Sequence, residues 1–455
     1  LEKKTASSLR FVMNWPGHMR TPQIISNVVE DLLALNDLEG AIKTSRMIIQ
    51  LQPQPPEQLM AKAWQTIANA KFDLKRYAEA ETAIDTVLLF PSVKGKIRIQ
   101  FSDRLAATIY RQAEQLNQKG LKAEAAQEFL RLGSKLPNAA IKINADYDAG
   151  TLFLELQQWN LAISLFEGLR LHFPQHELTR TLPPKLALAY ENTEQWQRAS
   201  EELETIASQN PDPKSDETRQ AIWLAATYQD KAKNGDQAIR LYKKYVWAYP
   251  RPLPQKVEGQ FRLVQLYQEK RIDTKRIFWL RGLIKSYDQG GDENSDRTQY
   301  LAAYAAFTLA EPGYKHFKTI ALTLPLKRSL KKKKKAMNAA LKSYIKTTEI
   351  GVSEFTTAGT FRIGDIYLTL AADLLASQRP KGLSNLELEQ YEILLEEQAL
   401  PFEDQAIEIL ESNAQLTLED IYDEWVKKSF VALSNLLPGR YAKQEQIEPY
   451  VETIY

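Results

Sequence analysis

The stretch QQWNLAISLFEGLRLHFP, residues 157–174, places Ala162 twelve residues before Pro174. Within it, Ala162, Phe166 and Leu169 recur at the spacing of one face of an α-helix, so the stretch predicts an amphipathic helix. A proline cannot continue a helix, and Pro174 is therefore expected to end this one. The small side chain of Ala162 would let a neighbouring helix approach closely.

The same skeleton recurs along the chain. An alanine stands twelve residues before a proline at Ala41, Ala125, Ala162, Ala199 and Ala238, and at Ala80 the interval is one residue shorter. These alanines follow one another at intervals of 37 to 45 residues, a period typical of arrays built from one supersecondary unit. The segment INADYDAGTLFLEL, residues 143–156, has a helical pattern of its own. Each unit is therefore expected to be a helical hairpin that buries its apolar faces by stacking on its neighbours.

This pattern resembles the tetratricopeptide repeat (TPR). The family's characteristic positions are matched in three units by Trp64 and Ala80, by Gly150, Phe153, Ala162, Phe166 and Pro174, and by Leu186, Ala187, Tyr190, Ala199 and Pro211. The first unit fits less well, because Ser45 stands where the family has an aromatic residue. The resemblance implies an all-α fold, a right-handed superhelical α-solenoid of TPR-like hairpins. The alternative, a helical bundle without repeats, would need these intervals to arise by chance.

The rest of the chain divides by composition. We expect an N-terminal lead-in over residues 1–21, about six to seven repeat units over 22–290, a linker over 291–298 and a further helical region over 299–455. The linker contains the start of a calcium-loop pattern, but Arg297 and Ala303 stand where such a loop needs Gly and Glu. In the last region, Pro312 with Gly313 and Pro401 are expected to interrupt helices, and Thr417 to cap one. We also expect a longer protein that extends beyond both ends of this sequence.

The C-terminal region resembles a second, more specific group. The segments GVSEFTTAGTFRIGDIY, LLEEQALPFEDQAIEI and IYDEWVKKSFVALSNLLPGRYAK are similar to parts of large TPR proteins of Gram-negative bacteria. Those proteins are associated with the cell envelope, beside proton-driven motors of the ExbB/ExbD–TonB or TolQ/TolR kind and beside gliding-type machinery. The resemblance implies an envelope location and carries no catalytic motif.

Composition narrows the function classes. The chain has 455 residues, a net charge of +2 and no cysteine, so disulfides, thiolate metal sites and a cysteine nucleophile are excluded, and an oxidising compartment is compatible. Charge is uneven, because residues 383–455 hold 16 acidic and 4 basic side chains. No apolar run reaches the length of a transmembrane helix. His172 and His176 are separated by Pro174, so a shared metal site is not expected, and neither is any cofactor or catalytic site.

Two surfaces are candidate binding sites. By resemblance to the TPR family, the partner-binding positions on the concave face are Asn144, Tyr147, Thr151, Glu155, Thr181, Leu188 and Glu191. A basic run is formed by Lys327, Arg328, Lys331, Lys332, Lys333, Lys334 and Lys335. It could be a solvated helix start, a segment that docks on the acidic residues 387–424, or a phosphate-binding patch. No aromatic residues alternate with these lysines to stack on bases, which disfavours nucleic acid. Trp159 and Trp196 are expected in the core, and Trp247 and Trp279 between units.

The sequence thus predicts a non-enzymatic scaffold for other proteins, located in the periplasm as part of an envelope complex coupled to a membrane motor or transport system. Two alternatives stay open. One is a cytoplasmic TPR adaptor, and the other is a solenoid that binds nucleic acid or anionic lipid through Lys331–Lys335. The oligomeric state and the identity of the partner do not follow from the sequence.

Overall fold

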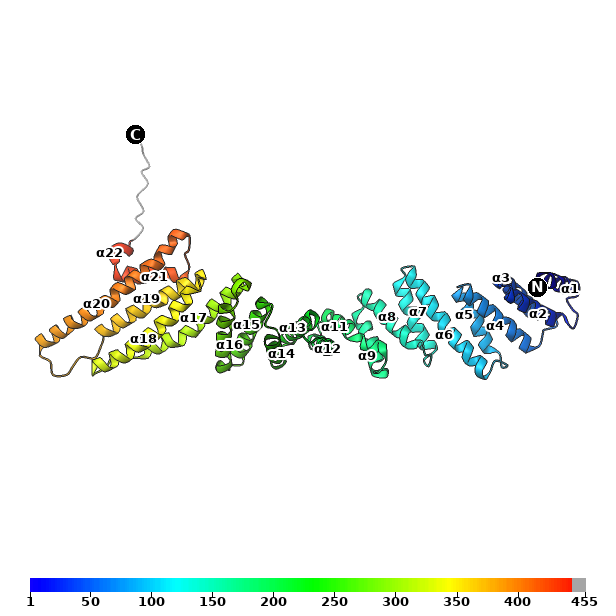
Figure 1. The fold of residues 1–455 in the computed structure, drawn as a ribbon, viewed down its shortest axis with the longest axis horizontal. Coiled ribbons are helices and arrows are strands. Elements are labelled where there is room, and N and C mark those ends of the chain that lie inside the picture. Colours follow the sequence, from blue (N-terminus) through cyan, green and yellow to red (C-terminus); the bar gives the residue numbers. More distant parts are fainter. Residues whose placement is uncertain (444–455) are drawn as a thin grey trace, which may run out of the picture. The chain divides into compact units, whose positions relative to one another are not determined.

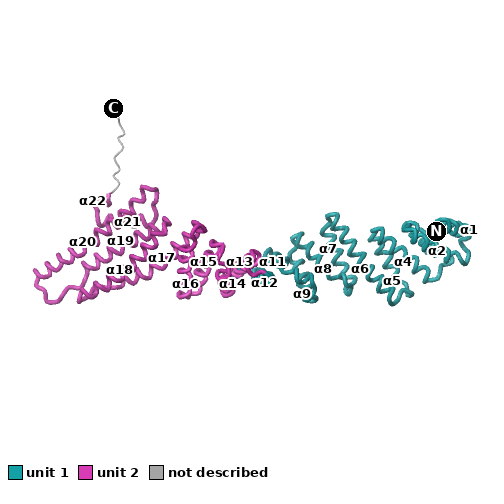
Figure 2. Tube along the Cα trace, viewed as in Figure 1, with its two compact units in different colours: residues 1–211, 231–233 teal, residues 212–230, 234–455 magenta. Residues whose placement is uncertain are grey.

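A computed structural model of the chain describes residues 1–443, and these residues form helices and turns without a strand (Figure 1). They divide into two compact units, residues 1–211 with 231–233 and residues 212–230 with the chain from 234 onward (Figure 2). In each unit, successive helices pair as antiparallel hairpins and each hairpin packs against the next. The predicted all-α solenoid of helical hairpins is confirmed.

Unit 1 begins with a helix where the sequence suggested a lead-in. Leu9 and Val12 of this helix pack against the apolar side chains of the first hairpin, which explains why the segment is folded. The helices of the unit are α1 (Glu2–Asn14), α2 (Thr21–Ala34), α3 (Leu38–Gln50), α4 (Glu57–Asp73), α5 (Tyr77–Leu89), α6 (Gly95–Gln118), α7 (Lys122–Lys135), α8 (Lys142–Glu155), α9 (Trp159–His172), the single turn α10 (Glu177–Arg180), α11 (Leu182–Asn192) and α12 (Trp196–Gln209).

Unit 2 continues the hairpins with longer helices. Its elements are α13 (Asp216–Lys231), α14 (Gly235–Ala248), α15 (Leu253–Glu269), α16 (Asp273–Asp288), the 3-10 turn η1 (Gly291–Glu293), α17 (Asp296–Thr319), α18 (Leu326–Glu349), α19 (Ser353–Leu375), α20 (Asn385–Gln415), the 3-10 turn η2 (Leu416–Glu419), α21 (Glu424–Leu436) and α22 (Pro438–Tyr441). The segment 291–298, expected as a linker, holds η1 and the start of α17 and lies inside this unit, where α16 packs against α17. The expected continuation past Tyr455 lies outside the described residues.

The hairpins between α2 and α16 share one turn geometry. Each turn holds one residue with positive φ, between 55° and 79°, and these residues are Asn36, Lys75, Gly120, Gln157, Glu194, Lys233 and Arg271. The next backbone N–H donates to a carbonyl five residues earlier, for example from Gln158 to Phe153 at 2.8 Å and from Gln195 to Tyr190 at 2.8 Å. This is the Schellman ending of a helix, and it starts the second helix in the same direction each time.

The repeated alanine lies at the helix crossing of each hairpin. Ala41, Ala80, Ala125, Ala162, Ala199 and Ala238 each follow the positive-φ residue by five positions, and all are completely buried. The last of these hairpins, α15 and α16, has the larger Arg276 at this position. The second helices end two or three residues before the expected prolines; α9 ends two residues before Pro174 and α3 three residues before Pro53. These observations confirm the sequence-based repeat and its register.

Three expectations about helix boundaries in unit 2 were wrong. Helix α17 runs through Pro312 and Gly313, and α20 runs through Pro401. A proline inside a helix costs about 3 kcal/mol, and here buried side chains beside each proline, including Ala310 and Ala399, join one apolar cluster that offsets the loss. Thr417 does not cap a helix. Helix α21 starts later, capped by Asp423, whose carboxylate accepts from the N–H groups of Trp425 and Val426 at 2.9 Å.

Candidate partner-binding face

Polar side chains connect the first helix of one hairpin to the first helix of the next. In unit 1, the Tyr110 hydroxyl on α6 donates to the Asp148 carboxylate on α8 at 2.5 Å, and the hydroxyls of Tyr147 and Thr181 lie 3.1 Å apart. In unit 2, the Arg262 guanidinium on α15 donates twice to Asp230 on α13, each time at 2.7 Å. These contacts hold successive first helices in register, and they define the surface that a partner would meet.

We call the part of this surface on α6, α8 and α11, together with the residue before α11, the first-helix face; it consists of Tyr110, Asn144, Tyr147, Asp148, Thr151, Thr181, Lys185, Leu188 and Glu191. Its centre is the ring of Tyr147. The Lys185 ammonium lies 5.2 Å from the centroid of that ring, within the range of a cation–π interaction. The Thr151 hydroxyl donates to the Tyr147 carbonyl at 3.0 Å. The centre therefore combines an aromatic ring, a cation and hydroxyl groups.

Burial raises the pKa of two side chains on this face. It raises the pKa of the Asp148 carboxyl above its usual range, and the hydrogen bond from Tyr110 opposes that shift. Burial, followed by the hydrogen bond to Asp148, also raises the pKa of the Tyr110 phenol. The phenol therefore stays protonated and keeps donating to Asp148. This pair acts as a bridge between α6 and α8, and the groups left for a ligand are those around Tyr147.

The sequence-predicted binding residues differ in their exposure and in their contacts. It brings Tyr147 and Thr181 into contact, and it leaves Leu188 45% exposed, with Asn144 and Glu191 exposed on the same two helices. Glu155 differs, because its carboxylate forms an ion pair with Lys122 of α7 at 2.9 Å. The binding role of all seven residues stays a prediction.

Sequence reasoning missed Tyr110, Asp148 and Lys185. A signal for two of them exists in the repeat register, because Asp148 and Lys185 each lie nine positions before a positive-φ turn residue, Gln157 and Glu194. Oppositely charged residues thus occupy the same position in successive hairpins. Comparison of charges at equal repeat positions would have pointed to this face.

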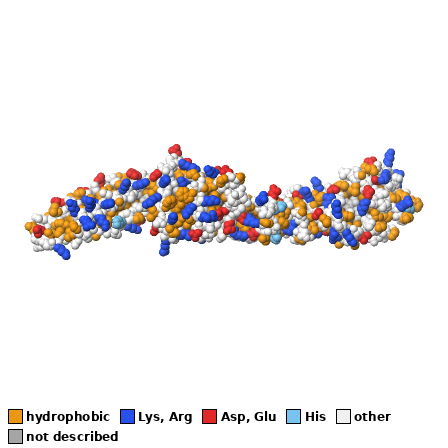
Figure 3. Space-filling view, turned by 60° about the horizontal axis from the view of Figure 1, so that its bottom comes forward, with side chains coloured by type: hydrophobic (Ala, Val, Ile, Leu, Met, Phe, Trp, Pro, Cys, Tyr) orange, Lys and Arg blue, Asp and Glu red, His pale blue; other side chains and the backbone are white. Residues whose placement is uncertain are grey.

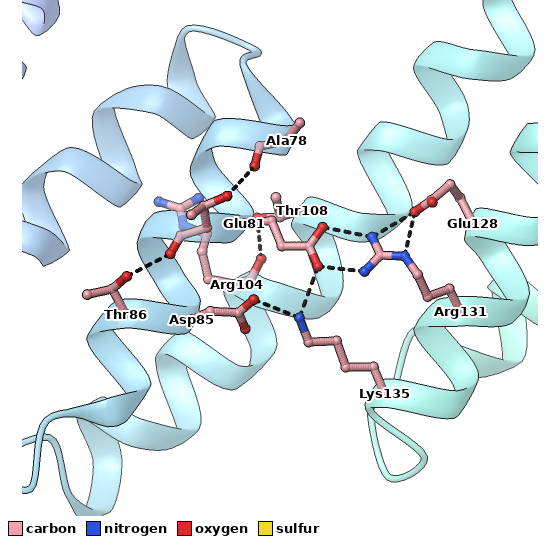
Figure 4. Close-up of polar contacts among 10 residues, drawn as sticks. Ala78, Glu81, Asp85, Thr86, Arg104, Thr108, Glu128, Arg131 and Lys135 are labelled. Atoms are coloured by element: carbon pink, nitrogen blue, oxygen red, sulfur yellow. Dashed lines mark hydrogen bonds and ion pairs between the residues drawn. The ribbon is translucent and has the colours of Figure 1, made fainter.

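The second helices carry a different network, centred on Glu81 of α5 (Figure 4). The Arg131 guanidinium on α7 donates to both Glu81 oxygens at 2.6 and 2.7 Å, and Lys135 donates to Glu81 at 3.0 Å and to Asp85 at 2.8 Å. The hydrogen bond from Arg131 lowers the pKa of Glu81 more than burial raises it. Since each ionised group has its partner, this network stabilises hairpin stacking and offers little to a ligand.

The basic run does not form one exposed patch. Lys333 is completely buried, its ammonium donates to the Ile320 carbonyl at 2.7 Å, and it forms an ion pair with Asp373 of α19. Lys334 is half-buried, 4.9 Å from the ring centroid of Phe402 on α20. The exposed cations are Lys327, Arg328, Lys331, Lys332 and Lys335. On the visible surface, acidic and basic side chains are interspersed along the chain (Figure 3).

The histidines and the hydropathy of the helices give little further chemistry. The His172 ring lies 2.8 Å from the Gly168 carbonyl, and His176 accepts from the backbone N–H of Leu178. Across residues 1–443, no three metal-ligating side chains gather closely enough to hold an ion. None of the helices described is both long enough and apolar enough to cross a bilayer.

No protein-family model matches the chain, and no curated protein matches it either. Among solved structures, the chain is similar to the C-terminal part of a TPR repeat-containing protein from Cytophaga hutchinsonii, with 14% identity, a TM-score of 0.29, and coverage of 60% of this chain and 97% of that chain. A tetratricopeptide repeat protein from Parabacteroides merdae gives 12% identity and a TM-score of 0.25, with coverage of 68% of this chain and 98% of that chain. The structure of Naa15/Naa10 bound to HypK-THB gives 13% identity and a TM-score of 0.29. The match covers 96% of this chain and 66% of that chain, slightly less than two thirds of its length. Similarity at this level gives no information about a partner.

Proposed function

We propose that the chain is a non-enzymatic scaffold that binds an extended peptide or a helix of another protein on its first-helix face. The observation that carries this proposal is the centre of the face, where Tyr147, Lys185 and the exposed Leu188 combine aromatic, cationic and aliphatic groups on two successive first helices. Aromatic and apolar anchors surrounded by polar groups are the usual composition of a protein-binding surface. Repeat arrays use such continuous faces to hold extended partners.

We further propose that this scaffold works in the periplasm, in an envelope complex beside a membrane motor or transport system. The support is the similarity of the three C-terminal segments to envelope TPR proteins, together with the absence of cysteine from the sequence. The competing proposal is a cytoplasmic adaptor with the same binding face. The two differ in the cell fraction that contains the partner.

Site-specific crosslinking tests both proposals. A photo-reactive amino acid replaces Leu188 on the first-helix face, and in a control chain it replaces Leu171 of α9, which is also exposed. The two proteins are incubated with detergent-solubilised envelopes and, separately, with cytosol. We expect one discrete crosslinked protein from position 188 in the envelope sample and none from position 171. Equal labelling at both positions would contradict the binding face, and a discrete partner only in cytosol would contradict the periplasmic location.

The exposed part of the basic run supports a second candidate function, the binding of nucleic acid or anionic lipid. Five exposed cations lie within one stretch of α18, and the shallow hollow along this stretch has no carboxylate among its lining residues. If the phosphate backbone is the ligand, binding must weaken steeply with added salt. Binding of an oligonucleotide or of phosphatidylserine vesicles that disappears on Lys331→Ala with Lys332→Ala would support it, and unchanged binding would exclude it.

A further inference from the structure

A second surface, separate from the first-helix face, lies on α14, α15 and α16 of unit 2. It is a groove of about 650 Å³ with an aromatic wall. Trp279 is 3% exposed, whereas Trp247 is 69% exposed and Phe278 51% exposed. The ring centroid of Trp279 lies 5.9 Å from that of Trp247 and 5.1 Å from that of Phe278. The expectation that Trp247 would be packed between units was wrong, because its ring lies beside Trp279 but most of the side chain is exposed.

The groove also has a polar floor. Gln260 of α15 is 5% exposed, and its side-chain oxygen accepts a hydrogen bond from the Ser286 hydroxyl at 3.0 Å. The amide nitrogen of Gln260 has no hydrogen-bond partner within residues 1–443, although the side chain lines the groove. This amide donor is open to the groove, and a ligand that supplies a carbonyl or carboxylate oxygen could accept a hydrogen bond from it.

The charges around the groove have one sign. Lys256, Arg281 and Lys285 line it, no acidic side chain does, and none of the three forms an ion pair within the described part of the chain. Burial lowers the pKa of the Lys256 ammonium, and the positive charges of Arg251 and Lys285 lower it further. In contrast, Arg131, Lys135 and Arg262, described above, each form an ion pair with a carboxylate. An anionic ligand would relieve the repulsion.

We propose that the groove on α14–α16 is a docking site for an acidic peptide segment of a partner protein, with one large apolar side chain as its anchor. The anchor lies against Trp247, Phe278 and Trp279, acidic side chains face Lys256, Arg281 and Lys285, and a peptide oxygen accepts from Gln260. Aromatic pockets with a cationic rim combine a desolvated anchor with charge complementarity, which is how small interfaces gain affinity and specificity. A membrane surface fits less well, because Trp279 and Gln260, which line the groove, are 3% and 5% exposed and cannot enter a bilayer.

Fluorescence anisotropy with defined peptides tests the proposal on the whole chain. The probe is a fluorescein-labelled peptide in which glutamates flank a single leucine. One comparison peptide has glutamine in place of each glutamate, and another has serine in place of the leucine. We expect the probe to bind, both comparison peptides to bind about tenfold more weakly or worse, and added salt to weaken the probe's binding. Failure of the probe to bind, or equal binding of all three peptides, would overturn the proposal.

Variants locate the binding. Trp247→Ala removes an exposed side chain without disturbing the core, and it should weaken binding of the probe about tenfold or more. Lys285→Glu should weaken binding and flatten its salt dependence. The matched controls are Trp15→Ala and Lys3→Glu on exposed positions of unit 1, and Tyr147→Ala on the first-helix face; these should leave probe binding unchanged. Loss of binding in the Tyr147→Ala control would move the site to the first-helix face and refute the groove.

Two other occupants would give distinct results. A second copy of this chain could present α20, which holds nine acidic and no basic residues and exposes Ile393 and Leu394. Sedimentation that shows self-association, lost on Trp247→Ala, would assign the groove to that copy and overturn the separate partner. Phosphatidylserine vesicles that bind through Trp247 while the peptide does not would overturn it in favour of a membrane.

Discussion

At the scale of the residue, substitutions at the turn position with positive φ can measure backbone strain independently of side-chain packing. Gly120 holds this position in one hairpin, and the equivalent residue of the next hairpin is Gln157, with φ of 79° and 57° respectively. A Cβ on Gly120 would contact nothing within 4 Å, so its replacement tests the backbone alone. Left-handed geometry disfavours every residue with a Cβ, by about 1 kcal/mol or slightly more.

We predict opposite effects at these two turns. Gly120→Ala should lower the free energy of unfolding by about 1 kcal/mol, and Gln157→Gly should raise it by a similar or smaller amount, because glycine adopts positive φ without steric cost. Urea denaturation followed by circular dichroism measures both. A loss of stability in both variants would show that the Gln157 side chain contributes more than its backbone costs, and would contradict this account of the turns.

A second prediction concerns the lysine run. Lys333→Ala should lower the free energy of unfolding by about 3 kcal/mol or more, because Asp373 would keep a partly buried charge without its partner. Lys332→Ala and Lys335→Ala change exposed neighbours and should alter it by less than about 0.5 kcal/mol. Chemical denaturation of the three variants decides the matter. Three equal effects would mean that Lys333 is no more important to folding than the exposed lysines.

At the scale of the element, sequence spacing predicted the hairpins because each depends on local chemistry. The buried alanines, the terminating prolines and the helical period are all properties of short segments, so Ala162 and Pro174 could be assigned correctly without a structure. The errors arose where packing against distant segments of the chain determines the structure. Pro401 is tolerated inside α20 because neighbouring helices pack around it, and Lys333 is buried because Asp373 lies on another helix. Neither partner is visible in the local sequence.

The candidate sites follow the same division. The repeat pattern placed Tyr147 and Thr181 on one face, because their positions in the helical register are local properties. It did not show that Tyr110 binds Asp148, nor that Trp247 stays exposed, because both depend on the distance between hairpins. Charge at equal repeat positions is the one sequence signal that could have recovered part of this information.

The network between α5 and α7 gives a prediction with a defined pH dependence. Glu81→Gln should lower the free energy of unfolding by about 1–3 kcal/mol at pH 7, because Arg131 and Lys135 lose their shared carboxylate. The pKa of Glu81 is lower in the folded protein than the usual glutamate value of 4.5. The stabilisation is therefore complete above that value and disappears as the pH falls through the lower, folded pKa.

Thermal unfolding at a series of pH values measures this effect. The difference between the original protein and Glu81→Gln should be constant near neutral pH and shrink below about pH 4.5. Glu124→Gln, an exposed position on α7, is the control and should show no such difference. A difference that persists unchanged in acid would mean that the loss comes from packing and not from the ionised carboxylate.

At the scale of the whole molecule, helix contacts are almost all between neighbours in the chain. α8 packs against α7 and α9, and α9 also packs against α11 and reaches α12, the other helix of the next hairpin, through the ion pair between Arg170 and Glu202. The stability of such an array is the sum of the intrinsic stabilities of its hairpins and of the interfaces between neighbouring hairpins. A destabilising substitution should therefore affect only the hairpin that contains it and its neighbours. A compact protein with one shared core would instead respond as a single cooperative unit.

Ala162→Trp tests this difference, because Ala162 lies completely buried at the crossing of α8 and α9 and has no room for an indole. Amide hydrogen exchange followed by mass spectrometry should show faster exchange in α8, α9 and α11, while α4, α5 and the helices α17–α19 keep their protection. The control is Leu161→Trp, an exposed neighbour on the same helix, which should leave exchange unchanged. If exchange rises equally in every helix, the hairpins unfold together, and the array does not behave as a chain of nearest-neighbour units.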